Sequence, residues 1–544
     1  LRQLGRPAQA LEAIRKHERL YRRAVWRLEY MKPWTLMKLR RYAQAERLAK
    51  SFLQKKKYIT TALNALCAIT FERGDRRGSL RYCRRAFAFD RKLQSMDRTT
   101  HRMNLAEAYL GVLDFAEAER LALASTRFFF PSVHANPWEF LAHLYLEQGQ
   151  VNQAFNALRR SKAWKERQLP HLKESLFASQ QLTQVHFWIT VGDVQNTLKA
   201  IEPVLDRPDR HGHTSAQKRQ QNVGAHLALR HTYVLQLALL REEAVMHGLW
   251  GWLGNLWQRW HVWSMRNRAT ASARRYFVRD LNFLRDSLSP YHAGGATLYS
   301  GGATLPSLWS SEVIATVGAG VARAQVALLR RREETQVAGL RAYFDVAEAE
   351  ALMLQGKWMN VLRFSQRALV GLPKSMLPLR VRMWALRGKV FQRLGRTRLM
   401  LENFALVLQK DGSMFRRLHM GIPVRIRYEG GQDARWLSRR LLASPRFYAN
   451  HQGFYLWITQ ENQQMEVRLS TAVGTSLAEV VVQRRTKEHK ASYLKRCYKR
   501  VHQSFFAKHL QYSRRDASSL DDSLLGTSSD QIPWKGLLKK KRTR

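Results

Sequence analysis

Cysteine is scarce in this chain, and its three copies form no recognisable metal or disulfide motif. Cys67, Cys83 and Cys497 are far apart among the 544 residues, and no two of them form a CxxC pair. Neither a disulfide framework nor a cysteine-based zinc site is therefore predicted.

Long apolar runs and catalytic motifs are also missing. No stretch of about 18 uncharged apolar residues occurs, so no membrane-spanning helix is predicted. The sequence has no HExxH, GxSxG or Walker-type motif and no nucleotide-binding GxGxxG. His211 and His213 could offer two metal ligands, but His226 and His231 lie on different faces of a helix and do not complete a site. We therefore predict a protein that is not an enzyme, with no catalytic residue, no cofactor and no metal site.

Acidic residues are few relative to basic ones. The chain has 92 Lys and Arg against 42 Asp and Glu, which gives a formal charge of +50 and a pI near 11.0. A charge of this size indicates an anionic partner, such as nucleic acid, acidic lipid or an acidic protein. The alternative is a codon bias toward Arg that is spread over solvated helix faces, and the scattering of Arg along the whole chain is compatible with both.

The composition and length predict a folded protein of several units. Hydrophobic residues make up 45% of the chain, which is ordinary for folded proteins and excludes a wholly disordered chain. At roughly 100–200 residues per domain, the length is too great for one compact core and favours several domains or a repeat array.

An internal repeat is clearest in Asn136–Trp164, NPWEFLAHLYLEQGQVNQAFNALRRSKAW. Apolar residues at helical spacing are followed by a glycine that breaks the helix and then by a second apolar stripe. The positions that carry this pattern are Trp138, Leu141, Ala142, Tyr145, Gly149 and Ala154. The small residues in both stripes predict two helices that approach closely.

Other copies follow the same grid. A second clear copy is carried by Trp384, Gly388, Phe391 and Gly395. Turn positions fall near residues 5, 40, 74, 113, 149, 192, 356 and 395. Leu113 and Arg40 replace the turn glycine, and Met400 replaces a small residue, so those hairpins are expected to pack less closely.

Residues 1–205 and 335–411 therefore resemble the tetratricopeptide repeat, in which a helix carrying W-x2-L-G-x2-Y is followed by a turn and a helix carrying A-x3-F. The resemblance implies a superhelix of stacked helical hairpins whose concave groove binds protein partners. The chain begins at Leu1 within such a repeat, so the array is expected to be incomplete at its N-terminus.

Residues 206–334 interrupt the repeat phase. A polar loop is predicted over 206–220 and helices over 222–246 and 310–330, and the segment GGATL, which occurs twice, predicts a flexible Gly-rich loop. A Trp-rich helix is predicted between the helix over 222–246 and the Gly-rich loop. Trp250, Trp257 and Trp260 share one face, and Arg259 and Arg266 flank it. This pattern indicates a helix that lies on an anionic membrane surface, a helix packed against the solenoid, or a site for a partner protein.

The period changes from helical to strand-like near residue 420. Residues 420–512 predict a small α+β module in the order β-α-β-β-β-α, and residues 513–544 predict a disordered basic tail. The first part of the module resembles the α/β domain that opens the Tol-system propeller protein and recurs in envelope-assembly lipoproteins. The residues that carry this resemblance are Ile426, Leu437, Leu441, Leu442, Ser444, Arg446 and Phe447.

The predicted fold class is a mostly α protein: a tetratricopeptide-like solenoid with an inserted helical segment and a small C-terminal α+β domain. The predicted function is a protein–protein interaction scaffold, with an anionic membrane surface as a further partner. The alternative is an RNA- or DNA-binding helical-repeat protein that uses its basic surface. The Tol-system resemblance implies a bacterial periplasmic or envelope location rather than a cytoplasmic one.

Overall fold

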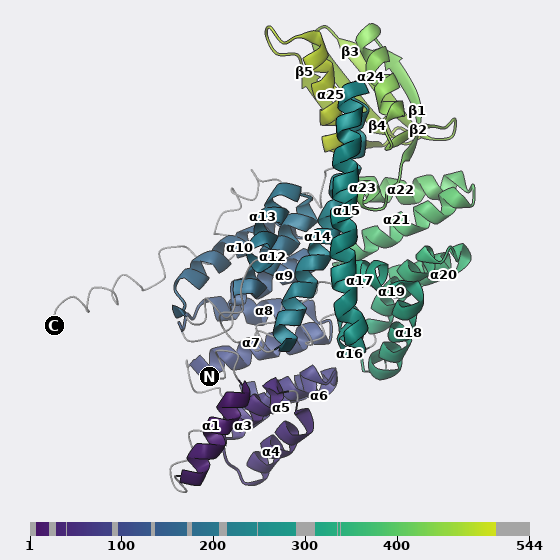
Figure 1. The fold of residues 1–544 in the computed structure, drawn as a ribbon. Coiled ribbons are helices and arrows are strands. Elements are labelled where there is room, and N and C mark those ends of the chain that lie inside the picture. Colours follow the sequence, from purple (N-terminus) through teal and green to yellow (C-terminus); the bar gives the residue numbers. More distant parts are fainter. Residues whose placement is uncertain are drawn as a thin grey trace, which may run out of the picture.

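The computed structural model describes residues 7–20, 29–39, 41–89, 96–131, 136–170, 177–205, 215–246, 249–289, 310–334, 336–337 and 339–506. Helices stack along most of the chain, and a small sheet with its own helices lies at one end (Figure 1). The predicted fold class is confirmed. The Gly-rich loop and the tail 513–544 lie outside the described residues.

Paired helices form the first part of the array. They are α1 (Pro7–Leu20), α3 (Lys32–Lys38), α4 (Tyr42–Gln54), α5 (Ile59–Glu72), α6 (Arg76–Phe89), α7 (Met96–Gly111), α8 (Phe115–Thr126), α9 (Pro137–Gln148), α10 (Val151–Glu166), α12 (Phe177–Val191) and α13 (Val194–Leu205). Four further helices continue it after the insertion: α19 (Leu340–Leu354), α20 (Trp358–Gly371), α21 (Leu377–Arg393) and α22 (Thr397–Asp411).

Left-handed backbone closes the helical pairs at the predicted turns. Gly149 and Gly395 have φ values of 77° and 67°, a conformation that glycine adopts without a side-chain penalty. Leu113, at a position where the repeat has glycine, adopts the same conformation with φ at 67°. The turn between α7 and α8 therefore keeps the repeat geometry at the cost of backbone strain.

The insertion consists of α14 (Ser215–Ala244), α15 (Leu249–Arg279), α16 (Leu281–Leu288), α17 (Ser310–Val317), α18 (Ala319–Leu329) and η2 (Arg330–Glu334). The predicted boundaries were wrong at two points. Helix α14 already begins within the predicted loop, at Ser215, and the helix predicted over 310–330 is interrupted at Gly318, whose φ is 90°. Helices α14 and α15 pack against each other as a long hairpin (Figure 1).

The concave groove expected of such an array is filled along α9 and α19. Helix α9 is buried at every position except His143, and α19 is buried at every position from Ala342 to Leu352. One hydrophobic core joins side chains of residues 67–191 to side chains of residues 342–390, and α9 contacts α21 directly. Helices α9 and α21 of the two repeat blocks therefore face each other, and the prediction of an open groove was wrong at these helices.

Polar side chains in this interior bond to one another across the array. Asn104 Nδ2 donates to Asn64 Oδ1 at 2.5 Å, and Thr183 Oγ1 donates to Glu139 Oε1 at 3.2 Å. His143 Nε2 lies 2.8 Å from the Thr183 hydroxyl, and burial lowers the pKa of His143 to about 4. These hydrogen bonds pair polar side chains that would bind water or a partner protein if they lined an open groove.

The C-terminal module is built from β1 (Ile422–Glu429), α24 (Gln432–Ala443), β2 (Phe447–Ala449), β3 (Phe454–Glu461), β4 (Gln464–Ser470), β5 (Ser476–Gln483) and α25 (Lys490–Phe506). The strand order is β2-β1-β3-β4-β5, with β1 parallel to β2 and β3 and the remaining pairs antiparallel. The predicted order lacked β2, because this three-residue edge strand is too short to show an alternating pattern. Helix α23 (Met414–Arg417) connects the module to the array.

A disulfide joins Cys67 on α5 to Cys83 on α6. No disulfide was predicted, because the three cysteines of the chain are far apart and form no CxxC pair. The hairpin turn at Gly74 lies near their midpoint and brings the two positions to the same level of neighbouring helices.

Candidate functional site: an exposed tryptophan surface

Helix α15 packs on the molecule through one narrow face. Asn255, Val262, Ala269, Ala273 and Phe277 are buried and recur at helical spacing. Asn255 Nδ2 also donates to the Leu240 carbonyl of α14 at 2.9 Å. These contacts fix which side of α15 faces inward.

The opposite face of α15 is apolar and exposed. At about 100° per residue, Leu253, Trp257 and Trp260 point away from the buried side, and Leu256 and Trp263 lie at one flank of this face. Trp257, Trp260 and Trp263 are 67%, 54% and 47% exposed. The rings of Trp257 and Trp260 stack with centroids 5.2 Å apart. We call these five residues the tryptophan surface.

The structure therefore contradicts the packing interpretation for the described tryptophans. Trp257 and Trp260 are exposed and do not belong to the hydrophobic core. The side chain of Trp250 lies outside the described part of the structure. An apolar surface of this kind is what protein partners or membranes cover.

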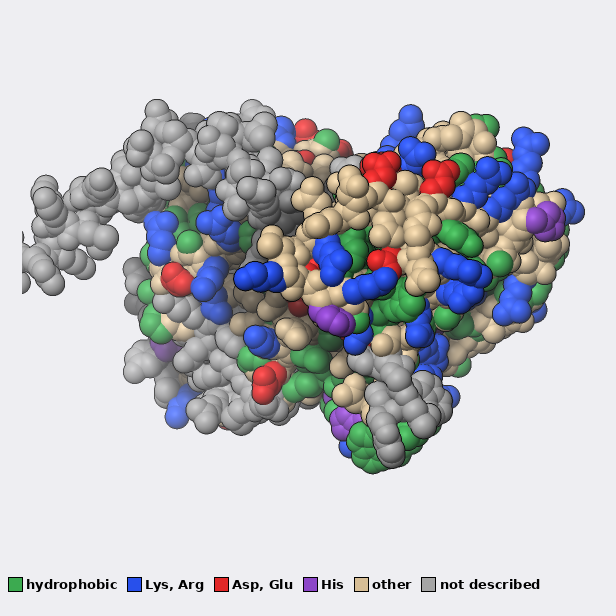
Figure 2. All heavy atoms as spheres, turned by 90° about the horizontal axis from the view of Figure 1, so that it is seen from above, with side chains coloured by type: hydrophobic (Ala, Val, Ile, Leu, Met, Phe, Trp, Pro, Cys, Tyr) green, Lys and Arg blue, Asp and Glu red, His purple; other side chains and the backbone are tan. Residues whose placement is uncertain are grey.

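Helix α15 carries several arginines and no acidic residue, but Arg259 and Arg266 follow buried Asn255 and Val262 by four positions and therefore lie near its buried face. Arg259 is half-buried and Arg268 is exposed. Arg266 is held by its neighbour, since its Nη2 donates to Asn267 Oδ1 at 3.0 Å. The helix therefore presents an apolar stripe with positive charge and no compensating carboxylate of its own. More widely, Lys and Arg side chains are scattered over the face of the molecule in Figure 2, where Asp and Glu are few.

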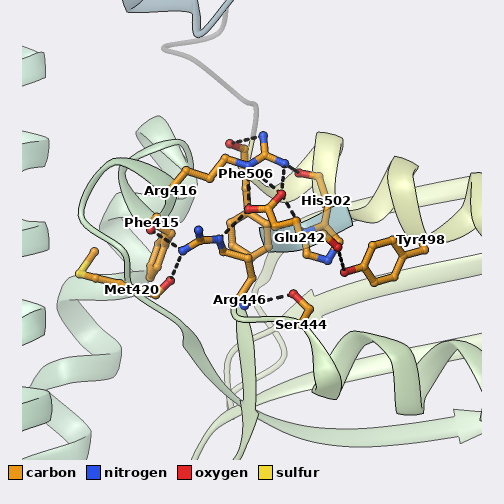
Figure 3. Close-up of polar contacts among 9 residues, drawn as sticks. All are labelled: Glu242, Phe415, Arg416, Met420, Ser444, Arg446, Tyr498, His502 and Phe506. Atoms are coloured by element: carbon orange, nitrogen blue, oxygen red, sulfur yellow. Dashed lines mark hydrogen bonds and ion pairs between the residues drawn. The ribbon is translucent and has the colours of Figure 1, made fainter. Parts of the chain in front are cut away.

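A buried ion cluster fixes the segment that precedes α15. The carboxylate of Glu242, near the end of α14, accepts from Arg416 Nε at 3.0 Å, from Arg416 Nη2 at 2.7 Å and from Arg446 Nε at 2.6 Å (Figure 3). His502 Nδ1 lies 3.4 Å from Glu242 Oε2. Burial alone would raise the pKa of Glu242, but His502 and Arg416 hold it well below its ordinary range. We call Glu242, Arg416, Arg446, Tyr498 and His502 the anchor cluster.

Backbone groups complete the anchor cluster. Arg446 Nη1 donates to the carbonyls of Phe415 and Met420, each at 2.9 Å, and the Tyr498 hydroxyl donates to the Glu242 carbonyl at 2.9 Å. Arg440 Nη1 donates to the Val245 carbonyl at 2.9 Å. The end of α14 is thus bonded to the connecting helix α23 and to the C-terminal module.

The sequence gives no local signal for the anchor cluster. Arg416 and Arg446 are 174 and 204 residues from Glu242 along the chain. Glu242 itself is one of two consecutive glutamates at a helix end, and only its burial distinguishes it from exposed Glu243.

The repeat positions singled out from the sequence lie in the interior. Trp138, Leu141, Ala142, Tyr145 and Ala154 are buried in the first hydrophobic core. They are the packing elements of the hairpin α9–α10 and not a binding surface.

The second set of repeat positions packs near the C-terminal module. Phe391 is buried in the second core, and Trp384 is half-buried against it. A Cβ atom on Gly388 would overlap the ring of Phe404, so only glycine fits there.

The described residues contain no group of three or more His, Cys, Asp or Glu side chains that could hold a metal ion. His211 and His213 lie outside the described part of the chain. His226 stacks on Tyr276, and His231 Nδ1 lies 2.9 Å from Glu312 Oε1. Burial alone would raise the pKa of Glu312, but Arg230 and His231 lower it to about 2.

No protein-family model and no curated protein matches this chain. Among solved structures, it is similar to a chain of Naa15/Naa10 bound to HypK-THB, at 13% identity over 74% of this chain and 75% of that chain, with a TM-score of 0.17. It is also similar to yeast Tom70, at 11% identity over 72% of this chain and 93% of that chain, with a TM-score of 0.20. Because both TM-scores are low, the functional argument rests on the surfaces of this chain.

Proposed function

We propose that the chain is a non-enzymatic protein-interaction scaffold and that the tryptophan surface of α15 is its docking site. The observation that carries this proposal is the exposure of Trp257, Trp260 and Trp263 on the side of α15 opposite its buried face. Helices α9 and α19 cannot offer a groove to a partner, because they are buried within the array.

The chemistry of the surface indicates the kind of partner. Tryptophan rings bind best when a partner removes them from water in a fitted pocket, and they dominate the energy of such interfaces. Arg259 and Arg268 lie on the same helix without acidic neighbours. A partner with an apolar face bordered by Asp or Glu complements this arrangement.

Changing Trp257, Trp260 and Trp263 together to Ser is expected to abolish partner capture. Each tryptophan at the centre of an interface contributes about 2 kcal/mol or more to binding. A photo-crosslinking residue in place of Leu253 in cells of the native host would identify the partner, and the affinity for that purified partner would then be measured for both chains.

The matched control changes Leu354, Met359 and Val370 to Ser. These side chains are also exposed and apolar, but they lie on or next to α19 and α20. The control is expected to bind like the wild type. Equal loss in both variants, or unchanged binding in the tryptophan variant, would show that the partner docks elsewhere.

A second candidate is attachment to an anionic membrane surface. It is favoured by the combination of exposed tryptophans with exposed Arg268 on a helix that has no acidic residue. None of the helices in the described residues is long and apolar enough to cross a bilayer, so this attachment would be peripheral.

Vesicle co-sedimentation separates the two candidates. If α15 lies on the membrane, the wild type sediments with phosphatidylglycerol vesicles, while the Trp257→Ser, Trp260→Ser, Trp263→Ser variant stays in the supernatant. Each arginine near an anionic surface adds about 1 kcal/mol, so binding would weaken with salt and with neutral lipid. If wild type and variant sediment equally, general charge attraction explains the binding and the membrane candidate is rejected.

We also propose an envelope location in a bacterium. It is supported by the resemblance of the C-terminal module to the Tol-system domain, since β1, α24 and β2 follow one another in the expected strand–helix–strand order. Fractionation of the native host tests this proposal, and recovery of the full-length protein in the cytoplasm alone would overturn it.

A further inference from the structure

The five-stranded sheet has one covered face and one open face. Helices α24 and α25 cover the side that carries Leu456, Ile458, Val467 and Leu469, all of which are buried in the second core. On the other side, the arginines of β1 and β4 are exposed and the aromatic residues of β3 are half-buried.

Strand register brings aromatic and basic side chains together on this open face. Arg425 pairs with Tyr455 and Arg427 with Trp457 across β1 and β3, and Trp457 pairs with Arg468 across β3 and β4. Paired residues on adjacent strands point to the same side of the sheet. Two aromatic rings therefore lie between three arginines.

The geometry of the rings is that of a stacking platform. The Tyr455 and Trp457 rings are nearly parallel, 24° apart with centroids separated by 6.0 Å. Arg425 lies over the Tyr455 ring at 5.3 Å and Arg427 over the Trp457 ring at 5.4 Å. Planar, positively charged groups already occupy the ring faces that planar bases would use.

Charge on the open face is arranged around these rings. Glu429 and Glu461 lie at the ends of β1 and β3, Glu466 lies on β4 opposite Thr459, and Glu479 on β5 pairs with Arg468. The central part, on β1 and β3, carries Arg425 and Arg427 without an acidic residue between them. The whole chain adds a formal charge of +50.

We propose that the open face of the C-terminal sheet binds single-stranded nucleic acid. Bases stack on Tyr455 and Trp457 in place of the Arg425 and Arg427 guanidinium groups, which turn with Arg468 toward the phosphates. A strand with splayed bases fits a flat aromatic surface, which a duplex with buried base faces does not. This activity is separate from docking at the tryptophan surface and does not depend on it.

Fluorescence anisotropy with a labelled oligouridine of about 12 nucleotides tests the proposal on the full chain. The Tyr455→Ile, Trp457→Ile variant keeps strand-forming residues but removes both rings, and it is expected to bind at least about tenfold more weakly. The Arg425→Gln, Arg427→Gln variant is expected to lower the steepness of the plot of log K against log salt by about 1.4, since each phosphate contact on a single strand contributes about 0.7.

The matched control is the Arg435→Gln, Arg439→Gln variant. These exposed arginines lie on α24, which covers the other side of the sheet, and their loss removes the same charge. The control is expected to retain the wild-type salt slope and nearly wild-type affinity. Thermal melting of each variant by circular dichroism shows whether the fold is retained.

Three results would overturn the proposal. The first is an equal loss of affinity in the β1 variant and in the α24 control, which would indicate general charge attraction. The second is equal affinity for the oligouridine and for a duplex of the same length, because a duplex cannot stack its bases on the rings. Cross-links from 4-thiouridine to peptides of β1 and β3 would support the site directly, and cross-links confined to the helical array would reject it.

Discussion

Replacing Glu242 with alanine is expected to lower the free energy of unfolding by about 3–5 kcal/mol, because it leaves two buried guanidinium groups without their carboxylate. Arg416 and Arg446 are both buried and both bond to Glu242. Their remaining partners are backbone carbonyls, which do not neutralise the charge. Because the cluster joins α14 to the C-terminal module, the loss is expected to loosen that junction first.

Urea denaturation and amide hydrogen exchange measure this effect. Exchange is expected to rise in α23, α25 and the end of α14 before it rises in the hairpins of the array. Glu243→Ala is the matched control, since Glu243 follows Glu242 on the same helix but is exposed. If both variants unfold at the same urea concentration, the anchor cluster does not hold the module.

The same cluster gives stability a pH dependence with a definite sign. The folded-state pKa of Glu242 lies below its ordinary value of 4.5. Near and below pH 4.5, the unfolded chain therefore protonates Glu242 while the folded chain keeps it ionised. The contribution of Glu242 is therefore fully present above pH 4.5 and is lost as the pH falls below it. The difference in stability between wild type and Glu242→Ala is expected to shrink in that range.

The local pattern of the sequence was sufficient to predict the hairpins and every strand of the sheet except β2. Turn glycines such as Gly149 and Gly395 mark a backbone conformation that is set within a few residues. The alternation of Val424, Ile426 and Tyr428 with Arg425 and Arg427 likewise indicates a strand with one polar face. Both signals depend only on residues that are close in the chain.

The orientation of α15 could not be predicted in the same way. The helix has two apolar faces, one with Val262, Ala269 and Phe277 and one with the tryptophans. Periodicity shows that both exist but not which of them packs. The smaller residues allow α14 to approach closely, and the tryptophans are left outside.

Contacts between segments that are far apart in the chain could not be predicted from local sequence patterns either. Helices of the first repeat block are covered by a second block that lies more than one hundred residues further along the chain. The hydrophobic core shared by residues 67–191 and 342–390 shows this contact. The sequence of one repeat does not show which distant segment of the chain will pack on its helices. The disulfide between Cys67 and Cys83 could have been predicted from the sequence. The two cysteines lie at similar distances on either side of the turn at Gly74, which places them side by side on neighbouring helices.

Replacing Ala142 or Ala154 with tryptophan is expected to lower the free energy of unfolding by about 3 kcal/mol or more. Both alanines have no exposed surface and lie in the first hydrophobic core, on the two helices of the hairpin α9–α10. A tryptophan there cannot be placed without moving a helix, and overpacking of this kind distorts side chains and backbone. The closure of the array makes relaxation harder, because α9 also contacts α12 and α21.

Gln153→Trp is the control for this prediction, since Gln153 precedes Ala154 on α10 and is exposed. A surface change of this kind is expected to alter stability by no more than about 0.5 kcal/mol. Thermal and urea unfolding of the three variants should therefore separate the two buried alanines from the exposed glutamine. Unchanged stability in both alanine variants would mean that α9 and α10 do not approach closely through these positions, and the assignment of the repeat grid would then be wrong.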